Sequence, residues 1–123
     1  MLSAVATVLL VDDDAMYRRA LAAFLDASFD LDVVGDTGDG IEAMSLAERL
    51  RPDADVIDIA MPGTSGLDVA EKILSALPET AVILVTGTPG GPERARAREL
   101  GAELLEKGDP LPVENALRRL TRR

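Results

Sequence analysis

Five short apolar runs alternate along this chain with five stretches in which apolar residues recur every three or four positions. Short β-branched runs predict buried strands, and a spacing of three to four residues predicts helices with one apolar face. Strands joined through helices run parallel, because the chain crosses back over the sheet before the next strand begins. The alternation therefore predicts an α/β domain with a doubly wound parallel sheet between two layers of helices.

Capping and breaking residues set the expected ends of these elements. Asp39 with Glu42, and Ser65 with Asp68, have the spacing of a capping box at a helix start. Gly35 and the polar residues after it are expected to end the second strand. The apolar runs cover 8–11, 31–34, 56–57, 81–85 and 102–105, and the helical stripes cover 17–25, 43–50, 70–77, 93–100 and 113–120.

Acidic residues follow two of the predicted strands. Asp12 and Asp13 come directly after the first apolar run, and Asp58 ends the third, where Met61-Pro62-Gly63 prevents any continuation. In a parallel sheet the carboxyl ends of the strands meet at one edge, which is where ligands bind in open α/β folds. We therefore expect three carboxylates to face one another at that edge.

Carboxylates held this close either share protons or bind a cation, because their mutual repulsion is unfavourable at the dielectric of a surface cleft. The chain has no histidine and no cysteine, so nitrogen and sulfur ligands are excluded. A hard, oxygen-preferring ion is favoured, Mg²⁺ or else Mn²⁺. Alternatively, each acid caps the following helix. Capping explains one acid, such as Asp14, but not acids that end two separate strands.

Composition narrows the class of protein. With 123 residues the chain has room for one domain, and its net charge of −9 argues against direct binding to a nucleic acid backbone. The lack of cysteine gives no support to an oxidising compartment, and no apolar run is long enough to span a membrane. Met1–Ala4 lack the charged start and apolar core of a signal peptide. We expect a cytoplasmic protein without membrane contact.

A polar residue of a particular kind ends each of four predicted strands. These residues are Asp12 and Asp13, Asp58, Thr86, and Lys107. In this order and at these spacings, the set resembles the receiver domain of two-component response regulators. The resemblance covers essentially the whole chain, 1–123, and implies a CheY-like, flavodoxin-like fold with strand order 2-1-3-4-5.

The resemblance also implies roles for individual residues. Asp58 would accept a phosphoryl group from a sensor histidine kinase and hold it as an acyl phosphate. Asp12, Asp13, Asp58 and the main-chain carbonyl of Ala60 would hold Mg²⁺, which neutralises charge on the incoming phosphoryl group. The domain would not be an enzyme in the ordinary sense, although it would catalyse its own phosphorylation and dephosphorylation.

Three further residues are implied in the response to phosphorylation. Thr86 would donate its hydroxyl and Lys107 its ammonium to the phosphoryl oxygens. Leu104 occupies the position, three residues before the lysine, at which family members usually carry an aromatic switch residue. The resulting conformational change would control an output and could include formation of a homodimer.

Three segments narrow the resemblance further. Tyr17–Leu21, Val33–Asp36 and Asp39–Ala43 look like the corresponding segments of NarL/LuxR-type regulators, which carry a DNA-binding domain after the receiver. No such output domain is present in this chain. The chain is therefore expected to be either a receiver taken from a longer transcriptional regulator or a single-domain regulator.

Two alternatives remain open. A phosphorylation-independent interaction module on a receiver fold would account for Leu104 in place of the aromatic. A haloacid-dehalogenase-like phosphatase would use Asp12 as the nucleophile, because Asp12-Asp13-Asp14 fits the Asp-x-Asp pattern of that class. The phosphatase and the receiver differ in which aspartate becomes phosphorylated, Asp12 or Asp58.

Overall fold

The computed structural model describes residues 5–122; Met1–Ala4, where no signal peptide is expected, and Arg123 lie outside the described residues. The described chain forms a parallel sheet of order β2-β1-β3-β4-β5, which confirms the predicted doubly wound fold. Its strands are β1 (Ala6–Val11), β2 (Leu31–Thr37), β3 (Ala54–Asp58), β4 (Ala81–Thr86) and β5 (Glu103–Glu106). Its helices are α1 (Ala15–Asp26), α2 (Gly40–Leu50), α3 (Gly66–Ala76), α4 (Gly91–Leu100) and α5 (Leu111–Leu120).

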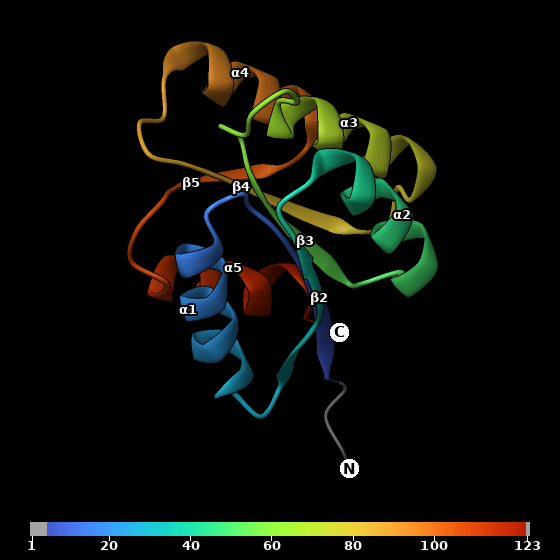
Figure 1. The fold of residues 1–123 in the computed structure, drawn as a ribbon, viewed down its shortest axis with the longest axis vertical. Helices are drawn as coiled ribbons and strands as arrows, with labels where there is room; N and C mark the ends of the chain where they lie inside the picture. The colour runs from blue at the N-terminus through green and yellow to red at the C-terminus, as the bar shows by residue number, and fades with distance from the viewer. Residues whose placement is uncertain (1–4, 123) are drawn as a thin grey trace.

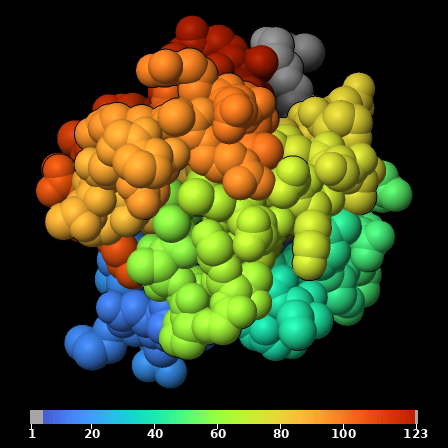
Figure 2. All heavy atoms as spheres, turned by 90° about the horizontal axis from the view of Figure 1, so that it is seen from above, coloured from blue at the N-terminus to red at the C-terminus, as the bar shows by residue number. Residues whose placement is uncertain are grey.

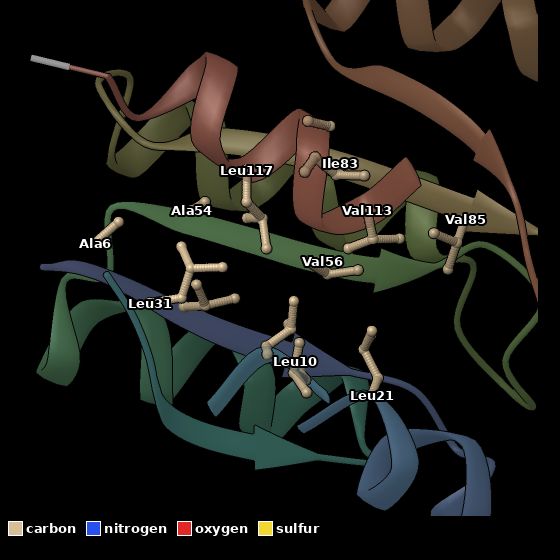
Figure 3. Packing of buried hydrophobic residues seen from close by; sticks show 13 residues of the cluster. Ala6, Leu10, Leu21, Leu31, Ala54, Val56, Ile83, Val85, Val113 and Leu117 are labelled. Carbon is tan, nitrogen blue, oxygen red and sulfur yellow. The ribbon is translucent and has the colours of Figure 1, made fainter. Parts of the chain in front are cut away.

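Helices cover both faces of the sheet (Figure 1). One apolar cluster lies between the sheet and the pair α1 and α5, and a second lies between the sheet and α2, α3 and α4. In Figure 3 the side chains of Leu10, Val56 and Val113 fill the first of these spaces. Because β1, β3 and β4 are covered on both sides, their residues are apolar almost without interruption. These buried central strands place the residues at their carboxyl ends firmly.

The second strand is longer than predicted. β2 continues past Gly35 to Thr37, so the expectation that Gly35 ends it is wrong. The pairing of β1 with β2 shifts by one residue between Val8 and Leu9, and Val11 then lies opposite Thr37. The main-chain N–H of Asp12 donates to Thr37 O at 2.9 Å. The edge strand β2 therefore stays hydrogen bonded to the first strand segment as far as Asp12, in the predicted site.

Side-chain caps begin three of the helices. Asp14 accepts hydrogen bonds from the main chain at the start of α1, as do Asp39 for α2 and Ser65 for α3. The predicted capping box at α2 is wrong, because the Glu42 carboxylate instead accepts the Thr37 hydroxyl at 2.5 Å. Within residues 5–122, no helix combines the length and the apolar character needed to cross a membrane.

Arg118 holds the end of α5 to the body of the domain. Arg118 donates to both oxygens of Asp30, at 3.0 and 3.1 Å, and to the Ser28 hydroxyl at 3.0 Å. Its guanidinium therefore fastens α5 to the loop between α1 and β2. A planar group with several donors suits this bridging contact better than a lysine would.

Candidate functional site

Four strands deliver the predicted residues to one edge of the sheet. Asp58 is the last residue of β3, and Asp12 directly follows β1, whose Val11 pairs with Ile57. Thr86 ends β4, and its main-chain carbonyl accepts the N–H of Lys107 at 2.8 Å. Figure 2 looks down on this part of the molecule, with the light-green segment after β3 in the middle and the blue start of α1 and orange α4 beside it. The predicted convergence is therefore present.

The Lys107 ammonium bridges two of the carboxylates. Its Nζ lies 2.8 Å from Asp12 Oδ2 and 3.2 Å from Asp58 Oδ2. The side chains of Asp12 and Asp58 are only 5% and 4% exposed, against 18% for Lys107. Charged side chains are tolerated in a buried position when they are paired with an opposite charge. The lysine thus offsets the repulsion between two acids that the fold forces together.

The burial of Asp58 and Lys107 affects the pKa of each group. Burial raises the pKa of Asp58 and the neighbouring Asp12 carboxylate raises it further, while Lys107 works in the opposite direction. Burial alone would lower the pKa of Lys107, but its hydrogen bonds and ion pairs with Asp12 and Asp58 outweigh that effect and raise it. Lys107 is therefore held firmly in its charged form.

The acids form a set of ligands suited to a hard cation. Asp12, Asp13 and Asp58 can each offer one oxygen, and these oxygens lie within 4.8 Å of one another. Asp13 is exposed, which leaves the set open on the solvent side. Asp12 Oδ2 is buried, and its contact among the described residues is the ion pair with Lys107 Nζ at 2.8 Å. Carboxylate oxygens in this arrangement fit a divalent ion such as Mg²⁺.

Ala60 contacts the site through its amide. Its N–H donates to Asp58 Oδ1 at 3.2 Å. The role implied by the resemblance uses the carbonyl oxygen of the same residue. The amide contact orients the Asp58 carboxylate, so that Oδ1 faces the loop and Oδ2 faces Lys107.

Thr86 and Leu104 have different surroundings. Thr86 is 7% exposed at the end of β4, beside the strand that carries Asp58. Leu104 is partly buried and packs against the apolar cluster under α2, α3 and α4. Leu104 thus faces the core in this structure, and it lies opposite Leu84 in the pairing of β4 with β5.

Gly66 is a site residue that the sequence reasoning missed. A Cβ at this position would lie 2.0 Å from the main-chain oxygen of Asp58, closer than any real contact allows. The first turn of α3 therefore packs directly on the backbone of the predicted acceptor. A glycine at the first position of a helix, where it has poor intrinsic propensity, was the available signal.

Tyr17 and Arg18 were also missed. The Tyr17 ring lies under Lys107, with Nζ 4.6 Å from the ring centroid. Arg18 Nη1 donates to Asp12 O at 2.5 Å, and its Nε donates to Asp36 Oδ1 at 2.7 Å. Periodicity assigned Tyr17 to the apolar face of a helix and left Arg18 off it, because spacing alone carries no information on contacts to distant strands.

The fold and the site define a flavodoxin-like α/β protein with a cationic and acidic cluster at the carboxyl edge of its sheet. The family model described as the response regulator receiver domain matches residues 8–107. This chain belongs to the response regulator receiver family.

Relatives of two kinds are similar in sequence. A protein-glutamate methylesterase/protein-glutamine glutaminase of Caulobacter vibrioides is 43% identical over 96 residues, which is 77% of this chain and 28% of the relative. The transcriptional regulatory protein LiaR of Bacillus subtilis is 40% identical over 79 residues, or 64% of this chain and 37% of that protein. The chain thus spans well under half the length of these relatives.

Solved receiver structures superpose closely. The response regulator domain of Thermotoga maritima CheB has a TM-score of 0.88 and 30% identity, with 95% of this chain and 96% of that one covered. The receiver domain of Mycobacterium tuberculosis NarL has a TM-score of 0.88 and 27% identity, with coverage of 98% and 100%. Because both kinds of regulator match, the family is established, whereas the narrower NarL/LuxR assignment stays a prediction.

Proposed function

We propose that this chain, from 1 to 123, is a receiver domain that accepts a phosphoryl group on Asp58 from a phosphohistidine of a sensor histidine kinase. The observation that carries the proposal is the contact of Lys107 Nζ with both Asp58 and Asp12, at the mouth of a three-carboxylate cluster. A cation fixed beside one carboxylate oxygen, in a cluster whose other carboxylate oxygens can bind a second cation, suits the transfer of an anionic group.

The acceptor chemistry follows from the orientation of Asp58. Its Oδ2 attacks the phosphorus atom, an O–P bond forms, the N–P bond of the phosphohistidine breaks, and the imidazole nitrogen keeps the electron pair. Oδ1 stays hydrogen bonded to the Ala60 N–H. Lys107 is already 3.2 Å from the attacking oxygen, so it meets the phosphoryl oxygens without a large movement.

The metal role rests on the acids. Asp12, Asp13, Asp58 and the carbonyl of Ala60 would hold Mg²⁺ or Mn²⁺, which when bound supplies positive charge to the phosphoryl group. Asp12 is the acid that Lys107 approaches most closely, so Asp12 would contact both the ammonium and the metal ion. Hydrolysis later returns the free Asp58 carboxylate when water attacks phosphorus and the P–O bond to Asp58 breaks.

The response to phosphorylation uses contacts that differ between the two states. A phosphoryl group shifts a conformational equilibrium only by its differential contacts, and the candidates are the Thr86 hydroxyl and the Lys107 ammonium. Leu104 lies on the strand that leads to Lys107 and is packed inward, so it is the relay residue of the proposal. Its movement would alter the surface formed by α4, β5 and α5.

The output lies outside this chain. The NarL/LuxR-like segments and the similarity to a transcriptional regulatory protein support control of transcription through a separate DNA-binding domain, with a phosphorylation-dependent homodimer. The similarity to methylesterases supports a second candidate, control of a linked catalytic domain. In both cases the receiver itself makes no contact with DNA or membrane and works in the cytoplasm.

Intact mass tests the proposal. Wild type, Asp58→Ala and the control Asp32→Ala, at an exposed acid on β2, are incubated with phosphoramidate or acetyl phosphate, with and without Mg²⁺. We expect one Mg²⁺-dependent phosphoryl adduct in wild type and the control, and none in Asp58→Ala. An adduct mapped to Asp12 would favour the phosphatase. No adduct, with Mg²⁺ bound, would favour the phosphorylation-independent module.

A further inference from the structure

We infer that Tyr17 is a positioning residue for Lys107 in this site. The inference rests on the proposed function, in which Lys107 meets the phosphoryl group on Asp58. Asp12 and Asp58 contact the Lys107 ammonium on one side, and a different group must hold it on the other side. The Tyr17 ring does so, with its centroid 4.6 Å from Nζ.

The distance is within the range of a cation–π contact, in which the negative face of the ring attracts an ammonium ion. Lys107 is mostly shielded from water, which strengthens the attraction. The ammonium therefore has the carboxylates of Asp12 and Asp58 as ionic partners and an aromatic face as a neutral partner. Three supports from different elements define its position better than two.

The start of α1 ties the ring to the acids. Asp14 Oδ1 accepts the Tyr17 N–H at 3.1 Å, and the Asp14 N–H donates to Asp12 Oδ1 at 2.9 Å. The same short segment therefore carries Asp12, Asp13 and the ring. Placement of the ring under Lys107 follows from the cap that places the acids.

A neutral partner has a specific advantage at this position. Another carboxylate would also hold Lys107, but it would add charge to the acid cluster and compete for the divalent ion. The face of the ring attracts the ammonium but has no oxygen that could bind the divalent ion. When a cation engages Asp12 and Asp58, their attraction for Lys107 is shared, and the ring still holds the ammonium near the acceptor.

The hydroxyl is not the part of Tyr17 that acts. It is buried and makes no side-chain hydrogen bond among the residues that the structure describes; the polar group beside it is the main chain of Gly108. The inference therefore predicts that Tyr17→Phe keeps the function and that Tyr17→Leu, which removes the ring but keeps an apolar side chain, loses it. Phe24→Leu is the matched control, because Phe24 is a partly buried aromatic on the same helix.

The first readout reports position and needs no phosphorylation. The chain has two lysines, so the ε-methylene NMR signals of a lysine-labelled sample separate into Lys107 and the exposed Lys72. In wild type, Tyr17→Phe and Phe24→Leu, we expect the Lys107 signal to be shifted upfield of Lys72 by the ring current. In Tyr17→Leu the shift is expected to collapse toward the Lys72 value.

The second readout is the rate of adduct formation from phosphoramidate with Mg²⁺. We expect about a fivefold loss in Tyr17→Leu, with Tyr17→Phe and Phe24→Leu at the wild-type rate. An unchanged ring-current shift or an unchanged rate in Tyr17→Leu would overturn the inference. If wild type itself forms no adduct, the proposed function fails, while the NMR shift still decides whether the ring holds Lys107.

Discussion

Lys107 lies closer to Asp12 than to Asp58, with Nζ 2.8 Å from Asp12 Oδ2 and 3.2 Å from Asp58 Oδ2. The lysine of this structure therefore occupies part of the space in which a divalent cation would be drawn to Asp12. Lysine and metal would be partners in the proposed phosphoryl transfer, but in the resting site a divalent ion would compete with Lys107 for Asp12.

Removal of the ammonium in Lys107→Ala is expected to raise Mg²⁺ affinity by about tenfold, because the competing positive charge is gone. Calorimetric titration measures this, with Lys72→Ala as the control. The same variant is expected to respond weakly to phosphorylation. Dimer formation measured with and without phosphoramidate checks this expectation. Unchanged Mg²⁺ affinity would show that Lys107 does not compete for Asp12.

Asp55 predicts a dependence of stability on pH. It is fully buried in β3, its Oδ2 accepts the Thr80 hydroxyl at 3.0 Å, and burial raises its pKa from 3.8 to about 7. The folded state therefore holds a proton that the unfolded state releases from about pH 4 upward. The contribution of Asp55 to stability falls as pH rises through this window and levels off above pH 7.

Asp55→Val removes this penalty. Between pH 5 and pH 8 the free energy of unfolding of wild type is expected to fall by roughly 3 kcal/mol relative to the variant. Urea unfolding at the two pH values measures the difference, and Asp32→Val, at an exposed position on β2, is the control. A constant difference between wild type and Asp55→Val would contradict the raised pKa.

Gly66→Ala tests the packing of α3 on the acceptor strand. The added methyl group would meet Asp58 O at 2.0 Å, so the variant is expected to lose about 2 kcal/mol or more of stability. Gly87→Ala is the matched control, because a Cβ there has no atom within 4 Å. Thermal unfolding compares the two, and equal melting temperatures would mean that α3 can move away from Asp58 at little cost.

The positions of the acids and of Lys107 were predictable because they depend on where strands end. Apolar runs marked β1 and β3, and parallel strands necessarily share a carboxyl edge. Asp58 was placed by Met61-Pro62-Gly63, which prevent the third strand from continuing. The roles of these residues in phosphoryl transfer stay predictions.

Contacts between side chains from distant segments were not predictable. Arg118 has the pattern of a solvated helix end, yet it pairs with Asp30, which lies 88 residues earlier. The end of β2 was set by main-chain pairing with β1, which the Gly35 signal does not reveal. Tyr17 fitted the apolar stripe of α1 equally well with or without a lysine above its ring.

The position of Tyr17 gives this protein a spectroscopic property. It is the only tyrosine of the chain, and the chain has no tryptophan. The near-ultraviolet absorption and intrinsic fluorescence of the molecule therefore arise almost entirely from a ring 4.6 Å from the Lys107 ammonium. Any event that moves that charge changes the optical spectrum of the whole protein, so the unlabelled molecule carries its own reporter of the site.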